Sequence, residues 1–177
     1  VLDAFEKILK VSPESLLILV PRHLERFERV KGILQESKIP FVSRSMREDV
    51  SEDTKILLGD TIGELNFLYS LADVAFIGGS LIDHGGQNLL EPSAQSLALI
   101  SGPSLRNFSD ISEQLIQNNA LAIAHDAEEL CNNYLLLIED ESTCNAIGAE
   151  AYKVFMKNRG ALDAIFNKLK PLISNII

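Results

Sequence analysis

Apolar and polar residues alternate along the chain in blocks whose lengths fit strands and helices in turn. Six mostly apolar blocks have the length of strands, and they cover residues 15–20, 39–45, 54–60, 73–79, 98–102 and 120–124. Around them, apolar residues recur with helical spacing over residues 1–10, 24–38, 63–72, 88–97, 107–119, 126–140, 142–158 and 160–174. Strands that alternate with helices predict an α/β fold, a doubly wound parallel sheet of about six strands with helices on both faces.

The composition fits one folded domain of ordinary size. The 177 residues are 46% hydrophobic, which is enough for a core and argues against disorder. The net charge of −9 argues against nucleic-acid binding, because phosphate backbones are held by clustered Lys and Arg. No apolar run approaches the roughly 18 residues of a membrane-spanning helix. Val1 already stands in a helical pattern, so we expect the chain to be part of a longer protein.

Few residues suggest metal or covalent chemistry. Cys131 and Cys144 lack the spacing of a metal motif and are interpreted as reduced residues of two helices. His84 and His125 are isolated, and no Ser or Cys stands in a nucleophile context, which disfavours a hydrolase triad. We therefore expect neither a metal ion nor a cofactor.

The loops directly after the strands are where a doubly wound fold binds its ligands. After the first strand comes PRHLERF (21–27). Pro21 ends the strand, and Arg22 then stands at a helix start, a natural place to meet an anion. A solvated residue at the helix entry explains Arg22 as well, so both interpretations stay open.

The loop after the third strand reads GDTIGEL (59–65). Asp60 or Thr61 is expected to cap the following helix. Gly63 lets a ligand approach the backbone, so the N–H groups of this loop would face a nucleotide base or ribose. Glu64 lies in the first helical turn, where the helix dipole favours an acid, and that stabilising role also accounts for it.

The loop after the fourth strand, GGSLIDHGGQNLLEP (78–92), carries glycine pairs at 78–79 and 85–86. Glycines at a strand end followed by a helix N-terminus offer free N–H groups to an anion. Asn88 and Glu91 fit a capping box, but that arrangement does not explain the glycine pairs. The pattern is neither GxGxxG nor GxxxxGK[ST], which counts against dehydrogenases and P-loop ATPases.

The loop after the fifth strand, GPSLRNFSD (102–110), contains a Gly-Pro turn. Arg106 would add positive charge to the same rim, although a solvated loop explains it equally well. Taken together, the four loops predict a nucleotide site at the carboxyl edge of the sheet.

The motifs PRHLERF, GDTIGEL, GGSLIDHGGQNLLEP, GPSLRNFSD and NRGAL (158–162), in this order, resemble the C-terminal half of bacterial 3-deoxy-D-manno-octulosonic acid (Kdo) transferases. The resemblance covers essentially the whole chain, and its most specific part is GGS…GG.N.LEP. It implies a GT-B glycosyltransferase, in which two Rossmann-like domains face a cleft, with residues 1–177 forming a single donor-nucleotide-binding domain. Such enzymes transfer Kdo from CMP-Kdo to the lipid A precursor in lipopolysaccharide biosynthesis.

Carried over to the matching positions, the resemblance implies nucleotide binding by Pro21, Arg22, Ile62, Gly63, Glu64, Asn88, Leu89, Leu90 and Glu91. The chain departs from the common pattern at Gln87, where many members have His, and at Leu89, where many have Pro. The family's general base, an acidic residue, lies in the N-terminal half, so no catalytic residue is expected here. The last helix, 160–174, would pack back towards that half.

The resemblance also implies partners and a location. The donor would be CMP-Kdo, and the lipid A precursor would bind through the N-terminal half. The full-length protein would be an inverting glycosyltransferase at the cytoplasmic face of the bacterial inner membrane, and this part of it would be soluble and inactive alone. Arg22 and the N–H groups near 85–88 would stabilise the departing phosphate.

Two other functions are compatible with the residues. Another GT-B glycosyltransferase, or a UDP-sugar 2-epimerase, would share the fold and the glycine-rich loop but bind a UDP-sugar. A non-enzymatic α/β interaction module would have purely structural loops, and the coincidence of four unusual loops at strand ends counts against it. A half of a two-domain protein is also expected to expose apolar surface.

Overall fold

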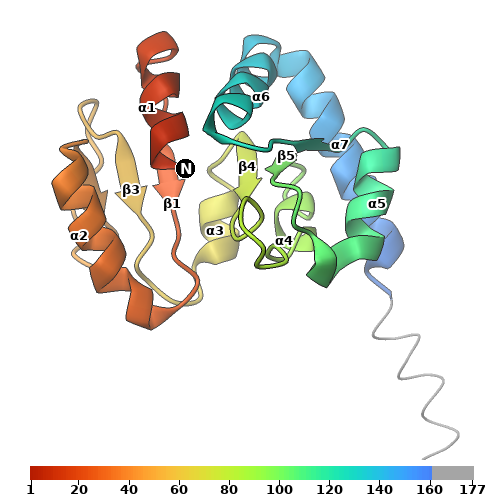
Figure 1. Ribbon diagram of the computed structural model, residues 1–177, viewed down its shortest axis with the longest axis horizontal. Coiled ribbons are helices and arrows are strands. Elements are labelled where there is room, and N and C mark those ends of the chain that lie inside the picture. The colour runs from red at the N-terminus through yellow and green to blue at the C-terminus, as the bar shows by residue number, and fades with distance from the viewer. Residues whose placement is uncertain (161–177) are drawn as a thin grey trace, which may run out of the picture.

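The computed structural model describes residues 1–160, and its six short strands are separated by helices everywhere except between β2 and β3. Figure 1 shows the arrangement. The strands are β1 (Leu17–Leu19), β2 (Phe41–Ser43), β3 (Ile56–Leu58), β4 (Val74–Ile77), β5 (Ala98–Ser101) and β6 (Leu121–Ile123). The helices are α1 (Leu2–Val11), α2 (Phe27–Ser37), α3 (Leu65–Tyr69), α4 (Leu90–Ser93), α5 (Ser109–Gln117), α6 (Ala127–Glu139) and α7 (Glu141–Asn158), with 3-10 turns η1 (Leu24–Arg26) and η2 (Arg106–Phe108). Each overlaps the block that predicts it, which confirms the α/β class. The expected helix over 160–174 and the end of the NRGAL motif lie outside the described residues.

The strands form two three-stranded parallel sheets, so the prediction of one sheet of about six strands is wrong. The strand orders are β1-β3-β2 and β4-β5-β6. Within residues 1–160, no strand pairing joins β1 to β4, the two edge strands where a single sheet would continue. Periodicity could not reveal this break, because an apolar run reports that a strand is buried and not which strand lies beside it.

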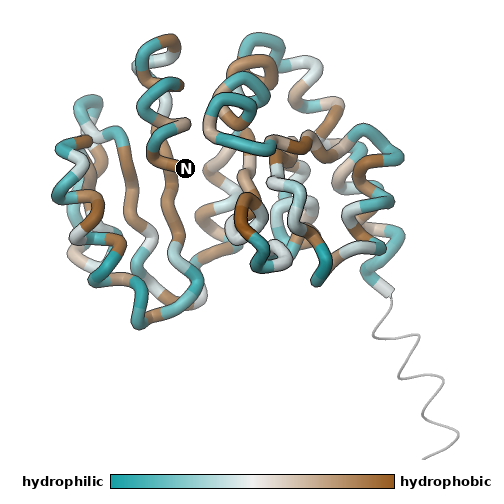
Figure 2. Tube along the Cα trace, viewed as in Figure 1, coloured by the Kyte–Doolittle hydropathy of each residue, from teal (hydrophilic) through white to brown (hydrophobic). Residues whose placement is uncertain are grey.

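Helices α1 and α6 connect the two sheets through buried side chains. Phe5 of α1 and Cys131 of α6 belong to the same buried cluster as Leu58 of β3. Ala4, one residue earlier on α1, is buried in a second cluster with Ile100 of β5. The two helices pack on each other and lie together above the strands in Figure 1. Figure 2 shows the strands as mostly hydrophobic segments between helices of mixed hydropathy.

Asp60 links the ends of β2 and β3 and does not cap α3. Its carboxylate accepts hydrogen bonds from the hydroxyls of Ser43 and Ser45, both at 2.6 Å, and from the Ser45 amide at 2.8 Å. The N-cap position of α3 is Glu64, without a side-chain cap, and Thr61 donates to Glu64 instead. The expected cap at Asp60 or Thr61 is therefore wrong, because Ser43 at the end of β2 and Ser45 just after it offer the carboxylate of Asp60 three donors.

No helix within the described part of the chain is both long enough and apolar enough to cross a bilayer. Cys131 and Cys144 are buried and free.

Gly148 should be essential for the packing of α7. A methyl group there would overlap the backbone carbonyl of Ser96, whereas a methyl group at Gly32 of α2 would meet no described atom within 4 Å. We predict that Gly148→Ala lowers the free energy of unfolding by about 1–3 kcal/mol through overpacking. The control Gly32→Ala should raise it by about 0.5–1 kcal/mol, since alanine loses less backbone entropy in a helix. Urea denaturation measures both, and equal effects would contradict this packing.

Asp60 should make stability depend on pH. Partial burial acts to raise the pKa of Asp60, but the hydrogen bonds from Ser43 and Ser45 outweigh it, and the pKa lies below its ordinary value. A lowered folded-state pKa stabilises the protein fully above the unfolded value of about 3.9, and this contribution is lost as pH falls through the folded-state pKa.

We therefore predict that Asp60→Asn lowers the free energy of unfolding at pH 7 by about 1 kcal/mol. This value is at the low end of the range for hydrogen bonds to charged groups, because Asp60 is partly exposed. The difference from the unaltered chain should shrink below about pH 4. Denaturation curves between pH 7 and 3 measure it, with Asp53→Asn in the exposed acidic loop as the control. A difference that stays constant over this range would rule out the charge as its cause.

Candidate functional site

The loops after β1, β3 and β4 lie on one side of the molecule, the lower side in Figure 1. Within the first sheet, the amide of Gly59 donates to the carbonyl of Leu19 at 2.9 Å, so the loop after β1 begins beside the loop after β3. Helices α3 and α4, which follow the loops after β3 and β4, pack on each other. The three segments that the resemblance assigns to the nucleotide are therefore found at one edge.

The segment after β1 presents an uncompensated positive charge. Pro21 is half-buried directly after the strand, and Arg22 is exposed. Arg22 makes no side-chain hydrogen bond or ion pair with the rest of residues 1–160. Its guanidinium is thus available to an anion, although no residue among 1–160 fixes its direction.

The segment after β3 is organised around the carboxylate of Glu64. Arg44 donates from Nε to Oε2 at 3.1 Å and from Nη2 to Oε1 at 2.8 Å, and the hydroxyl of Thr61 donates to Oε2 at 2.5 Å. These hydrogen bonds, first that of Arg44 and then that of Thr61, hold the pKa of Glu64 below its ordinary value. Ile62 is 72% exposed, and Gly63 adopts a φ of +84°. The backbone here is open to a ligand.

The second glycine pair closes a loop, so the N–H groups of Gly85 and Gly86 are not free as the predicted cradle requires. Gly86 donates to the carbonyl of Gly79 at 3.2 Å, and both have positive φ. Gly85 donates to the hydroxyl of Ser104 at 3.0 Å. A methyl group at Gly85 would lie 2.5 Å from Nδ2 of Asn107, and one at Gly86 would lie 2.8 Å from Leu105. The glycines are needed for left-handed turns and for close contact with the 102–107 loop.

Asn88 and Glu91 interact, but the predicted capping box is wrong, because the N-cap of α4 is Leu89 and it has no side-chain cap. The side chain of Asn88 accepts from the amide of Leu90 at 3.0 Å and donates to Oε1 of Glu91 at 3.0 Å. Leu89 is fully buried, backbone included, so it presents no surface to a ligand, while Leu90 is half-buried. Burial, and then the charge of Glu91, raise the pKa of Tyr69 on α3 to about 12. Tyr69 therefore lies within electrostatic range of the Glu91 carboxylate.

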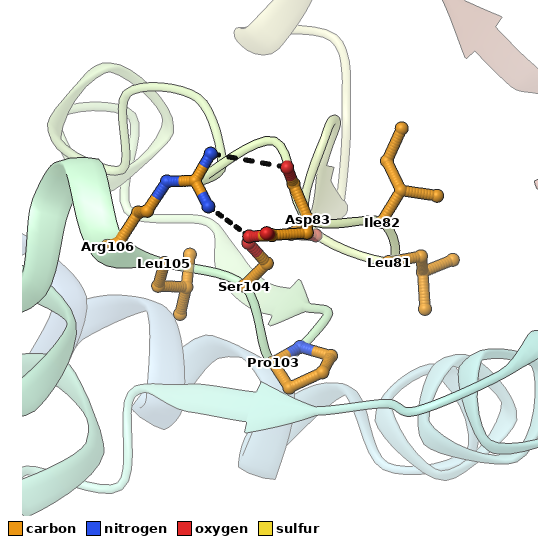
Figure 3. A pocket seen from close by; sticks show the side chains of 8 residues that line it. Leu81, Ile82, Asp83, Pro103, Ser104, Leu105 and Arg106 are labelled. Carbon is orange, nitrogen blue, oxygen red and sulfur yellow. Dashed lines mark hydrogen bonds and ion pairs between the residues drawn. The ribbon is translucent and has the colours of Figure 1, made fainter.

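A pocket of about 430 Å³ opens beside the glycine-rich loop (Figure 3). It is lined by Ser80, Leu81, Ile82, Asp83, Pro103, Ser104, Leu105 and Arg106. Arg106 forms an ion pair with the Asp83 carboxylate and donates to the Asp83 carbonyl at 3.2 Å. The positive charge expected from Arg106 is thus matched by an acid in the same pocket.

Two residues of this edge were missed in the sequence, Arg44 and Tyr69. Arg44 directly follows β2, and the rule that selected the other loops, a polar residue at a strand end, also selects it. Tyr69 had no such signal, because its proximity to Glu91 arises from the packing of α3 on α4.

The arrangement suits binding more than covalent chemistry. Glu64 and Glu91 can accept hydrogen bonds from hydroxyls, and Arg22 can donate to a phosphate. Within residues 1–160, no three His, Cys, Asp or Glu side chains are grouped to hold a metal ion.

Several known proteins are similar to the chain in sequence, although no protein-family model matches it. It is 38% identical over 174 residues to a 3-deoxy-D-manno-octulosonic acid transferase of Haemophilus influenzae, covering 98% of this chain and 41% of that protein. It is 35% identical over 159 residues to the enzyme of the same name from Bordetella pertussis, covering 87% and 37%. The chain thus spans about two fifths of the length of these curated relatives.

The fold is similar to a solved structure from the same group of proteins. The crystal structure of the C-terminal CMP-Kdo binding domain of WaaA from Acinetobacter baumannii matches with a TM-score of 0.81 and 35% identity, over 86% of this chain and 80% of that one. The motifs, the parallel α/β architecture and these similarities agree. The chain belongs to the family of 3-deoxy-D-manno-octulosonic acid transferases.

Proposed function

We propose that residues 1–177 form the donor-nucleotide-binding domain of a longer Kdo transferase and bind CMP-Kdo at the carboxyl edge of β1, β3 and β4. The observation that carries this proposal is the meeting of the segments 21–22, 62–64 and 88–91 at one edge of the fold. The similar domain from Acinetobacter baumannii, described as CMP-Kdo binding, supports the choice of ligand.

Each part of the nucleotide has a matching group at this edge. Arg22 is exposed beside Pro21 and would donate to the phosphate. The carboxylates of Glu64 and Glu91 would accept from the ribose hydroxyls. Gly63, with its positive φ, would let the backbone of the 62–64 segment approach the base.

The glycine-rich loop would contribute fewer backbone donors than its sequence suggests. The N–H groups of Gly85 and Gly86 are used inside the protein, so the phosphate would meet those of Gln87 and Asn88. Leu90 would contribute a backbone contact, whereas the fully buried Leu89 would support this segment from inside the fold. The side chain of Gln87 lies over Gly78, where an added methyl group would be 3.4 Å from its Nε2, so it fills space at the end of β4.

The rest of the longer protein would supply the chemistry. The relatives are more than twice as long as the matched region, and we assign the general base and the lipid A precursor site to that remainder. The base would deprotonate the acceptor hydroxyl, which attacks the anomeric carbon of Kdo as CMP departs. The full-length protein would act without a cofactor at the cytoplasmic face of the bacterial inner membrane.

Binding of a UDP-sugar donor is the main competing proposal, since the fold and the contacts that hold the strand-end loops are compatible with either nucleotide. The names of the relatives at 38% and 35% identity favour Kdo as the sugar, and the description of the similar Acinetobacter baumannii domain favours CMP as its nucleotide. A purely structural module is disfavoured by Arg22, whose exposed charge no described residue balances.

Titration of the chain with CMP and with UMP tests the ligand. We predict that CMP binds at least about tenfold more tightly than UMP. Uracil differs from cytosine in its donors and acceptors, so a hydrogen bond to the base would be lost, at a cost of about 1–3 kcal/mol. In NMR spectra, the backbone amides of 22, 62–64 and 88–91 should shift. A preference for UMP would support the UDP-sugar proposal, and a folded chain that binds neither would contradict both.

Arg22 is tested in the full-length enzyme. We predict that Arg22→Ala lowers kcat/KM about a hundredfold, the loss typical of removing one donor to a developing negative charge. Arg29→Ala, an exposed arginine on α2, is the matched control and should leave the rate unchanged. Unaltered transfer by Arg22→Ala would remove Arg22 from the site.

A further inference from the structure

Arg44 contacts the nucleotide-binding segment from a neighbouring strand. It directly follows β2, and its amide donates to the carbonyl of Leu58 at the end of β3, at 2.9 Å. Its guanidinium forms a two-pronged pair with Glu64, and its Cζ lies 6.0 Å from the ring centre of Phe67. A planar guanidinium that donates through two nitrogens fixes the orientation of a carboxylate as well as its position.

The 60–64 loop is held at both ends by the same short segment. Ser43 and Ser45, on either side of Arg44, bind the carboxylate of Asp60, while Arg44 binds that of Glu64. Between these two anchors lie the exposed Ile62 and a glycine with positive φ. This stretch buries little surface of its own, so its shape depends on the two carboxylates being held.

Glu64 keeps acceptor capacity for a ligand while it is held. Its Oε2 accepts from both Arg44 and Thr61, whereas its Oε1 accepts from Arg44 alone. A carboxylate oxygen can accept two hydrogen bonds, so Oε1 retains room for a hydroxyl donor.

We propose that Arg44 is a positioning residue. Acting through Glu64, it holds the 60–64 loop and the Glu64 carboxylate in the orientation that receives the nucleotide. This inference rests on the proposed nucleotide site. Arg44 itself makes no contact with the ligand, and its side chain serves affinity by pre-forming the loop before binding.

A purely structural ion pair would behave differently. The two side chains are 40% and 32% exposed, and ion pairs of that exposure contribute little to stability. Removal of Arg44 should therefore change nucleotide affinity far more than it changes the melting temperature.

A double-mutant cycle on the 177-residue chain tests the inference, with CMP affinity measured by calorimetry. We expect Arg44→Gln to weaken CMP binding about tenfold with a nearly unchanged melting temperature, and Arg44→Lys to weaken it less. The double variant R44Q/E64Q should bind no more weakly than Glu64→Gln alone, because Arg44 acts only through Glu64. Arg29→Gln removes the same charge from α2 and should leave affinity unchanged.

Two outcomes would overturn the proposal. Unchanged affinity in Arg44→Gln would show that the pair does not shape the site. Additive losses in R44Q/E64Q would show that Arg44 contacts the nucleotide itself. If Arg44→Gln does not fold, Arg44→Lys replaces it in the same cycle.

Spectra of the ligand-free chain separate this inference from the proposed function. The amide signals of Ile62 and Gly63 should move in Arg44→Gln and stay in place in Arg29→Gln. If the unaltered chain binds no CMP, the nucleotide proposal fails. Movement of these two signals would then still report that Arg44 holds the loop, and unmoved signals would overturn the positioning role.

Discussion

The burial of α1 and α6 against both sheets is the interaction on which the relative placement of the loops depends. No strand pairing connects β1 with β4 in the described chain, so no backbone ladder fixes one sheet against the other. Ala4 and Phe5, adjacent on α1, are buried in the clusters of different sheets. The proposed site takes residues from the ends of both sheets. The geometry of the proposed site therefore depends on the packing of α1 and α6 against the strands, away from the carboxyl edge.

At the carboxyl edge, the carboxylates of Glu64 and Glu91 already accept hydrogen bonds from other side chains of the protein in the absence of a ligand. Glu64 is held by Arg44 and Thr61, and Glu91 is held by Asn88. A carboxylate fixed in this way loses little conformational freedom when it accepts a further hydrogen bond, which favours binding. The glycine-rich loop is held by different means, since the 102–107 loop packs against glycines that leave no room for a side chain.

Local pattern was sufficient for the elements and insufficient for their partners. The apolar runs located all six strands, because burial leaves a trace in each strand's own residues. Local periodicity carries no information on contacts between residues well separated in sequence. It therefore could not predict the break between the two sheets, the hydrogen bond of Ser43 to Asp60 or the ion pair of Arg44 with Glu64. The glycine pairs were recognised as special, but the N–H groups of Gly85 and Gly86 were wrongly expected to be free. The nine residues proposed for the nucleotide came from the resemblance to a family.

The distribution of arginine explains how an acidic chain can attract an anion. The net charge is −9, yet a local potential depends on nearby charges more than on the total. Arg22, Arg44 and Arg106 all follow strands at the carboxyl edge. Arg44 and Arg106 are balanced by Glu64 and Asp83, so each is committed to holding a loop. Arg22 has no such partner within residues 1–160, and for this reason we propose that the phosphate binds at the end of β1 and not in the pocket beside β5.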